Sequence, residues 1–333
     1  MRGRSAQPRG RPLTADAIRR HRLRAQRLAD APSAAPADVV RALVGIQAQD
    51  RAASRLALIT RGAHDVPAGT VGDGIVRTWA MRGTLHLIAA EDLPLMLAIF
   101  APLHLARGQR RLTQLGLPPE LAERSTAETA AILAEHGPLT RHELAERLRE
   151  RGVPVAAEGQ APIHVVRRAA LSGVLAEAGV RGREELYGPI DPGPLPDRDQ
   201  AVAELARRYA AAHAPATADD FATWSGLPAA DVHRAWEDSE PSTGEPEEGP
   251  VRLLPAFDEW LLGWASRHLV LPKTHAAKVA PGGIVRPVAI ADGRAFATWR
   301  RAGRRVELEP FGRLTRAMRA GVEAEAARLG LEV

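Results

Sequence analysis

Gln47 and Gln49 lie two positions apart in the stretch GIQAQD, residues 45–50. A glutamine amide is neither a useful proton donor nor a nucleophile, but its oxygen accepts hydrogen bonds while its nitrogen donates them. Two such amides can together hold and orient a water molecule. The alternative is that both side chains only satisfy backbone groups at a break between two helices.

The spacing of this pair determines whether the two amides can act together. Residues i and i+2 do not share a face on a helix, but they do on an extended segment. We expect Gly45 to end one helix and Gln49 or Asp50 to begin the next. Both amides are then expected to project from a helix end toward one point.

Other motifs for catalysis or cofactor binding are missing from the sequence. The stretch PGGIVRP lacks the lysine of a phosphate-binding loop, and none of the 11 histidines forms an H-E-x-x-H motif. No G-x-S-x-G stretch is present to anchor a serine nucleophile. The sequence therefore predicts a protein that uses neither a metal nor a cofactor.

The charge of the chain is mildly basic and uneven. Net charge is +5, and residues 1–30 hold nine arginines against Asp16 and Asp30, whereas the charged residues of 237–250 are all acidic. One interpretation is a basic face for nucleic acid with an acidic loop kept away from it. The other is a disordered tail and a solvated loop.

The composition also bears on the cellular location of the protein. Its lack of cysteines rules out disulfides, thiolate zinc sites and cysteine nucleophiles. The basic N-terminus is not followed by the apolar segment of a secretory signal, and no apolar run reaches the roughly 18 residues of a membrane helix. We therefore expect a cytoplasmic protein that does not enter a membrane.

The chain repeats a plan of helices followed by a strand pair, which is typical of winged-helix modules. We predict an α+β fold of tandem winged-helix (helix-turn-helix) modules arranged around a small antiparallel sheet or barrel. The first predicted unit is a basic N-terminal arm (1–12), which is either ordered or disordered. It is followed by winged helix 1 with the Gln-Ala-Gln motif (13–116), winged helix 2 (117–190), a winged-helix-like unit (197–237) and a C-terminal β-rich region with a hairpin and a final helix (251–333).

Local signals fix several of these elements. Thr14 or Asp16 can cap the first helix, and Thr140 with Glu143 forms a capping box for a helix of the second unit. Near the C-terminus, the stretches 283–290, 294–301 and 304–311 predict a three-stranded meander with Asp-Gly at its first turn. A last amphipathic helix is expected over about 312–329.

Four stretches resemble the winged-helix family of bacterial DNA glycosylases related to AlkZ and YcaQ. Gln47-Ala48-Gln49 matches the Gln-Φ-Gln motif of that family, although Ala48 is smaller than the usual residue there. The segment WAMRGTLHLI matches its Arg-Gly-Thr-x-His segment, and LLPAFDEWLLGWASRHLVL and VRPVAIADGRAFATWRR resemble its C-terminal region. The resemblance covers roughly residues 14–330.

This resemblance implies an enzyme that excises alkylated purines from double-stranded DNA. Family members act on bulky N7-guanine adducts or interstrand crosslinks, in DNA repair or in self-resistance to a genotoxic natural product. On this basis we expect a monomeric, monofunctional glycosylase in which Gln47 and Gln49 position the water. The residues expected to contact DNA are Arg51, Arg55, Arg82, Thr84, His86, Arg294, Arg300, Arg301, Arg304 and Arg305.

The residues alone leave other functions open. A non-catalytic DNA-binding protein or transcriptional regulator could share this fold, as could a winged-helix scaffold that binds protein. The roles of three further residues are also open. His86 is either near the DNA or holds the glutamine loop, and Asp258 and Glu259 belong either to the catalytic site or to a structural link with the first module.

Overall fold

The fold is α+β, with helices predominating and three small antiparallel sheets. The structure is a computed structural model that describes residues 13–67, 71–237 and 247–333. The predicted N-terminal arm and most of the acidic loop lie outside the described residues. The α-helices are α1 Ala15–Ala25, α2 Pro36–Leu43, α3 Arg51–Thr60, α4 Leu93–Gln114, α5 Pro119–His136, α6 Arg141–Glu150, α7 Ala161–Leu171, α8 Arg198–His213, α9 Ala218–Ser225, α10 Ala229–Ala235, α11 Glu259–Leu262, α12 Ala276–Val279 and α13 Arg316–Arg328.

The strands form three separate sheets. Their orders are β1-β3-β2, β4-β6-β5 and β10-β9-β8-β7. The strands are β1 Ile46–Gln47, β2 Ile75–Trp79, β3 Leu85–Ala89, β4 Leu139–Thr140, β5 Leu175–Arg181, β6 Glu184–Pro189, β7 Arg252–Leu254, β8 Val288–Ala291, β9 Arg294–Ala302 and β10 Arg305–Pro310.

Residues 13–116, the segment of the first predicted unit and called the N-terminal module below, contain α1 to α4 and the first sheet. Thr14 caps α1 by accepting from the backbone N–H of Ala17. In the sheet, His86 of β3 pairs with Gln47 on one side and with Thr78 of β2 on the other. Residues paired across a sheet project to the same face, so these three side chains form one row.

Residues 117–190, the segment of the second predicted unit and called the central module below, contain α5 to α7 and the second sheet. The predicted capping box is present, because Thr140 accepts from the N–H of Glu143 and Glu143 accepts from the N–H of Thr140. Strands β5 and β6 form a hairpin at the end of the module. Helices followed by such a hairpin are compatible with a winged helix.

Helices α8, α9 and α10 occupy the segment in which a third unit is predicted. Thr217 caps α9 with Asp220 in a second capping box. Within residues 197–237 no strand follows these helices. Side chains of α8 and α9 share one continuous apolar core with α4 and with the central module, so these parts of the chain are packed together.

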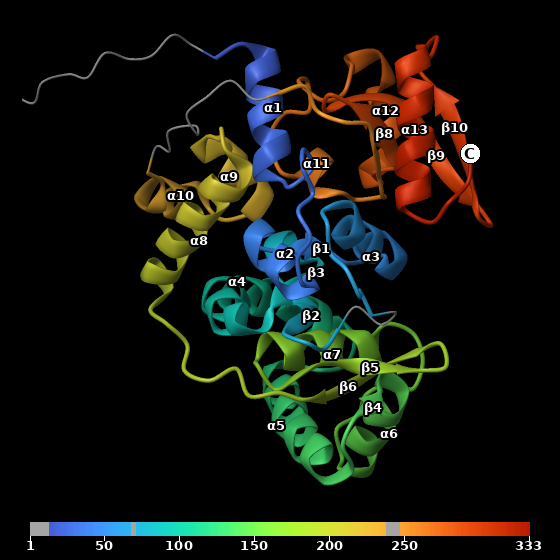
Figure 1. The fold of residues 1–333 in the computed structure, drawn as a ribbon. Coiled ribbons are helices and arrows are strands. Elements are labelled where there is room, and N and C mark those ends of the chain that lie inside the picture. The colour runs from blue at the N-terminus through green and yellow to red at the C-terminus, as the bar shows by residue number, and fades with distance from the viewer. Residues whose placement is uncertain (1–12, 68–70, 238–246) are drawn as a thin grey trace, which may run out of the picture.

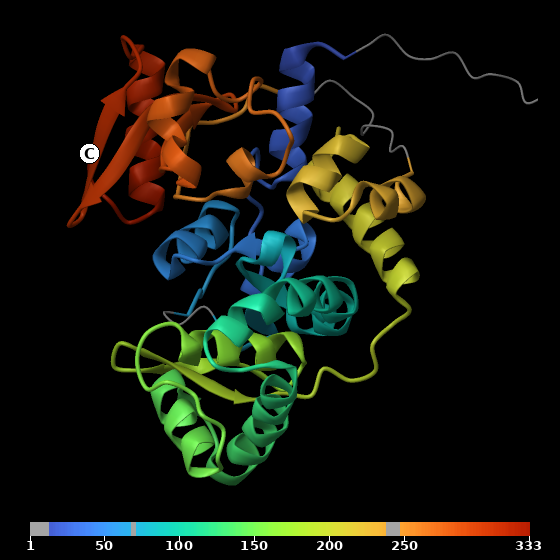
Figure 2. The same ribbon diagram turned by 180° about the vertical axis from the view of Figure 1, so that it is seen from behind.

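The C-terminal sheet is open and four-stranded, so the predicted alternative of a barrel is wrong. The predicted meander is present as β8, β9 and β10, and β7 adds a fourth strand at the edge. The sheet and α13 lie at one end of the molecule and α5 and α6 at the other, rather than the modules surrounding the sheet (Figures 1 and 2). Helix α13 covers one face of this sheet, and α1 and α11 pack toward the other.

Candidate active site

A short loop between α2 and α3 carries the two glutamines. Helix α2 ends at Leu43; its C-cap, Val44, has a positive φ, and Gly45 follows with φ +132°. A side chain at Gly45 would meet the end of Met81 at 2.8 Å, so this turn favours glycine. After β1, Asp50 caps α3 by accepting from the N–H of Ala53 at 2.9 Å. The predicted break between two helices is therefore present.

The two amides are hydrogen-bonded to each other. Nε2 of Gln47 donates to Oε1 of Gln49 at 2.7 Å. Gln47 is buried, with an exposed fraction of 8%, whereas Gln49 is exposed. The side chains thus converge on one point, as the spacing predicts, and Gln49 presents the pair to the surface.

Arg82 holds Gln47 from the opposite side. Its Nη2 donates to Oε1 of Gln47 at 3.1 Å, and its Nη1 donates to the carbonyl of Trp224. Arg82 lies in the turn between β2 and β3 with φ +53°, and burial lowers the pKa of its guanidinium group. Arg82, Gln47 and Gln49 therefore form a chain of side-chain hydrogen bonds that ends at the surface.

Glu259 binds the backbone of the same loop from inside the protein. Its Oε1 accepts from the backbone N–H of Gln47 at 3.1 Å, and its Oε2 accepts from Nε1 of Trp224 at 3.1 Å. The side chain is 1% exposed, and this burial raises the pKa of Glu259, although Arg82 acts in the opposite direction. Glu259 thus contacts the catalytic candidate through the backbone and does not reach the surface.

Asp258 is a link between distant parts of the chain. Its two carboxylate oxygens accept from Nη1 and Nη2 of Arg61 at 2.8 and 2.7 Å, and both side chains are fully buried. Asp258 also caps α11 through the N–H of Trp260. Of the two roles left open for Asp258, this geometry fits the structural one, a link between the C-terminal region and the N-terminal module.

The placement of His86 requires a correction. Its exposed fraction is 0%, and its Nδ1 is bonded to the carbonyl of Thr84 at 3.0 Å. Burial, followed by the nearby charge of Arg82, lowers the pKa of His86 to about 3, so the ring is neutral. A side chain this deep in the sheet cannot contact DNA without moving β3, and the structure instead places it beside Gln47. Thr84 is half-buried and donates to the carbonyl of Met81.

Arg51 and a residue that the sequence did not single out, Arg77, connect the loop to the central module. Arg51 is bound by Glu177 and Glu185, so these carboxylates occupy the guanidinium group for which a DNA contact is predicted. Arg77 is buried in β2 and donates to the carbonyl of Ala48 at 2.9 Å. The one sequence signal for Arg77 is that it is the charged residue of a strand that is otherwise uncharged, Ile75–Trp79.

Comparison with known proteins identifies the family of this chain. A family model described as DNA glycosylase AlkZ-like matches residues 40–331. The chain belongs to the AlkZ-like DNA glycosylase family. A curated relative from Streptomyces sahachiroi, named "Interstrand DNA cross-link repair glycosylase", is 28% identical over 337 residues, which cover 90% of each chain.

A solved structure supports the fold of this glycosylase. The structure titled "Streptomyces sahachiroi DNA glycosylase AlkZ" is similar with a TM-score of 0.75, covering 96% of this chain and 97% of that one at 24% identity. The family predicted from the sequence motifs is therefore confirmed. The chain is a DNA glycosylase, which sets aside the alternatives of a regulator and of a protein-binding scaffold.

The other arginines predicted to contact DNA fall into two groups on the glycosylase. Arg55 is exposed on α3, and its Nη2 donates to the carbonyl of Val66. The remaining five are exposed on the β9–β10 hairpin of the C-terminal sheet: Arg294, Arg300, Arg301, Arg304 and Arg305. Several of them pair with acidic neighbours, Arg294 with Asp16, Arg300 with Glu307 and Arg304 with Glu332.

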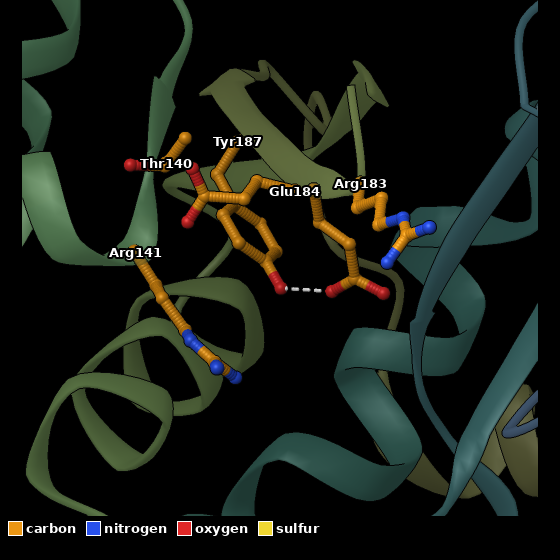
Figure 3. A pocket seen from close by; sticks show the side chains of 6 residues that line it. Thr140, Arg141, Arg183, Glu184 and Tyr187 are labelled. Carbon is orange, nitrogen blue, oxygen red and sulfur yellow. Dashed lines mark hydrogen bonds between the residues drawn. The ribbon is translucent and has the colours of Figure 1, made fainter. Parts of the chain in front are cut away.

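A polar pocket of about 230 Å³ lies on the central module of the glycosylase, and its lining includes Glu185, which also contacts Arg51 and Arg77. Figure 3 shows Tyr187 at this pocket between Arg141, from the start of α6, on one side and Arg183 on the other. The dashed line is the bond from the hydroxyl of Tyr187 to Glu185. Across the described residues there is no group of three or more His, Cys, Asp or Glu side chains that could hold a metal ion.

No helix among the described residues is both long and apolar enough to cross a membrane.

Proposed function

We propose that this glycosylase hydrolyses the N-glycosidic bond of alkylated purines in duplex DNA, with bulky N7-alkylguanines and interstrand crosslinks as its preferred substrates. The name of the S. sahachiroi relative supports the crosslink as a substrate class. The observation that carries the proposal is the hydrogen-bonded pair of amides at a surface loop, with its neighbouring carboxylate, Glu259, buried beneath it. Such an enzyme serves DNA repair or self-resistance to a genotoxic natural product.

The chemistry of the substrate suits a site without an acid. An N7-alkylated guanine carries a positive charge, so it leaves as a neutral base and needs no protonation. The remaining task is to orient a water that attacks the oxocarbenium-like sugar. Oε1 of Gln49 accepts one bond from Gln47 and keeps a second lone pair for that water. The carbonyl dipoles also lie close to the developing positive charge, which they stabilise.

The buried Gln47 has a different task from the exposed Gln49. Arg82 occupies its oxygen and so orients its NH2 group toward Gln49. Because the NH2 group of Gln47 meets the oxygen of Gln49, that oxygen is held in place before DNA binds. We infer that Gln49 contacts the water and that Gln47 orients Gln49.

The tryptophans favour a site that does not enclose an extruded base. Many glycosylases flip the base into a pocket lined by aromatic rings. Here five tryptophans are less than 10% exposed: Trp79, Trp224, Trp260, Trp264 and Trp299. Trp224, Trp260 and Trp299 also donate their indole N–H to groups inside the protein. We therefore propose an open site that binds the damaged duplex without full extrusion of the base, which accommodates a bulky or crosslinked lesion.

The substrate class is tested by measuring base release from three matched duplexes. One carries a single N7-alkylguanine, one an N7–N7 nitrogen-mustard crosslink, and one no modification. We expect release of the free base from the duplex with the single N7-alkylguanine and separation of the two strands of the crosslinked duplex, each leaving an alkali-labile abasic site. The unmodified duplex should stay intact. Excision limited to another lesion class, such as deaminated bases, would contradict the proposal.

A further inference from the structure

Arg77 is the buried charge closest to the backbone of the glutamine motif. It lies in β2 with an exposed fraction of 5%. Its Nε donates to the carbonyl of Ala48 at 2.9 Å, and its Nη1 donates to Glu177 at 2.7 Å and to Glu185 at 2.9 Å. One guanidinium group therefore joins the residue between the two glutamines to two carboxylates of the central module.

The backbone of the motif is held on three sides. The N–H of Gln47 donates to Glu259, the N–H of Ala48 donates to the carbonyl of Leu85 at 2.7 Å, and the carbonyl of Ala48 accepts from Arg77. The Ala48 carbonyl belongs to the peptide that leads into Gln49. Its orientation fixes where the Gln49 side chain starts, so Arg77 constrains the exposed member of the pair.

The carboxylates that hold Arg77 come from the β5–β6 hairpin. Glu177 of β5 is buried between Arg77 and Arg51 and accepts from both, at 2.5 Å for each nitrogen of Arg51. Glu185 of β6 also contacts both arginines and accepts from Tyr187. Although burial disfavours its charge, the bond from Tyr187 and the two guanidinium groups keep the pKa of Glu185 below its usual value. Two positive and two negative groups thus balance inside one cluster.

We propose that Arg77 is a positioning residue of the glycosylase, and that Glu177 of the β5–β6 hairpin holds it in place. In this arrangement the central module sets the geometry of Gln47 and Gln49 without touching the damaged base. The inference rests on the proposed role of the two glutamines. It also assigns Arg51 to this cluster, where its charge is used inside the protein.

A purely structural role for the cluster predicts a different behaviour. Removing one partner of a buried ion pair destabilises a protein wherever the pair lies, so loss of stability alone does not separate the two roles. A second buried pair offers a matched control. Arg252 of β7 and Glu325 of α13 form an ion pair at 3.1 Å in the C-terminal region, with side chains 10% and 2% exposed.

The experiment compares Glu177→Gln with Glu325→Gln in the full chain, below the melting temperature of both. Three quantities are measured: the single-turnover rate of excision at saturating enzyme, the affinity for the damaged duplex, and hydrogen exchange of the peptide over residues 46–54. Arg77→Lys is a third variant, because a lysine keeps the charge but cannot contact Ala48 and both carboxylates together.

We expect Glu177→Gln to lower the excision rate about tenfold or more, within the roughly hundredfold that a 1 Å misplacement can cost, while affinity changes little. Exchange over residues 46–54 should rise in Glu177→Gln and not in Glu325→Gln. Arg77→Lys should show a smaller loss of rate. Equal rates in Glu177→Gln and Glu325→Gln at equal fractions folded would overturn the inference.

The exchange measurement separates this inference from the proposed function. If the wild type releases no base from any alkylated duplex, the proposed function fails, and exchange alone decides the role of Arg77. If hydrogen exchange in Glu177→Gln becomes faster only over residues 46–54, the result would then still support the proposal that Arg77 and Glu177 hold the glutamine loop. Unchanged exchange there in Glu177→Gln would overturn it.

Discussion

At the scale of single residues, Gln47 and Gln49 differ because one is buried and the other is exposed. Gln47 lies between Arg82 and Gln49 and bonds to both. A chain of hydrogen bonds whose inner members are buried is more rigid than an exposed amide alone. The exposed end of this chain, the amide of Gln49, is therefore oriented before substrate arrives, and the proposed catalysis by electrostatic stabilisation requires such preorganisation.

Arg82→Lys distinguishes a positioning role for Arg82 from the DNA contact predicted from the sequence. A lysine keeps the positive charge but lacks the planar fork that reaches both Gln47 and the carbonyl of Trp224. We expect the single-turnover excision rate to fall about tenfold, a loss of about 1.4 kcal/mol of transition-state stabilisation. The dissociation constant for duplex DNA should stay within about twofold, since the charge is retained. A weaker DNA complex with an unchanged rate would show that Arg82 acts on the phosphate backbone instead.

The sequence identified the glutamine pair but not what holds it. The i, i+2 spacing with Gly45 before it and Asp50 after it predicts a break with two converging amides, and the structure has both. The sequence alone did not predict a role for Arg77, because a single charged residue in a strand suggests a buried ion pair but does not identify the partner residue. Its partners Glu177 and Glu185 lie about one hundred residues further along the chain, and only the packing of two modules brings them together.

At the scale of elements, we propose that the β9–β10 hairpin is the part of the C-terminal sheet that meets DNA. Its five arginines are exposed at the end of the molecule that carries α13. Their pairs with Glu307, Glu332 and Asp16 lie at the surface. Exposed ion pairs of this kind contribute little to folding stability, typically 0 to about 1 kcal/mol. A DNA phosphate can therefore replace the carboxylate as the partner of the arginine.

Arg300→Gln tests this contribution of the hairpin. Each phosphate contact that is lost should reduce the slope of log affinity against log salt by about one, and the excision rate at saturating enzyme should not change. A titration of duplex affinity against salt concentration measures the slope. Arg207→Gln is the matched control, because Arg207 is 70% exposed and paired with Glu204 on α8, as Arg300 is 77% exposed and paired with Glu307. Equal slopes for the two variants would contradict a DNA contact at Arg300.

Element boundaries could be predicted wherever a capping or turn residue marks them. Thr14 and Thr140 cap the helices for which they were proposed, and Asp292-Gly293 forms the first turn of the meander between β8 and β9. Strand β7 could not be predicted. It has three residues, Arg252–Leu254, and becomes a strand because β8, more than thirty residues later, pairs with it. Whether the strands form an open sheet or a barrel likewise depends on whether the two edge strands pair with each other, and local sequence patterns do not encode that pairing.

At the scale of the whole molecule, buried polar contacts tie the C-terminal region to the first module. Arg61 and Asp258 form a fully buried pair, and Arg252 donates to the carbonyl of Leu28 at 2.9 Å. In addition, α4, the central module and α8 share one apolar core. We infer that the glutamine loop is rigid because it lies where the C-terminal region, the N-terminal module and the central module meet. Glu259 binds its backbone at Gln47, and Arg77 binds it at Ala48.

Two buried histidines make this assembly sensitive to acid. Burial lowers the pKa of His86 and of His213 to about 3 in each case, whereas an unfolded histidine titrates near 6.5. The unfolded chain therefore binds more protons below that pH, and stability is lost as pH falls from about 6.5 toward 3. Each histidine contributes about 1.4 kcal/mol per pH unit over this interval.

His213→Asn should reduce this loss, because asparagine does not titrate and can still donate to the carbonyl of Tyr209, which His213 contacts at 3.2 Å. Between pH 7 and pH 5 the wild type is expected to lose about 2 kcal/mol more unfolding free energy than the variant. Urea unfolding at the two pH values measures the difference, and His233→Asn, at an exposed position on α10, serves as the control. The same pH dependence in wild type and His213→Asn would contradict a neutral, buried His213.

The most direct test of the account is the single-turnover excision rate of Gln47→Ala and Gln49→Ala on a duplex with one N7-alkylguanine. Duplex affinity is measured alongside, and Gln200→Ala, an exposed glutamine of α8, is the control. If the pair orients the water, each substitution lowers the rate by more than tenfold, toward the roughly hundredfold that loss of one preorganised group costs. Affinity should stay within a few-fold, and the control should match the wild type. Unchanged excision in both variants would contradict the central claim that Gln47 and Gln49 together orient the attacking water.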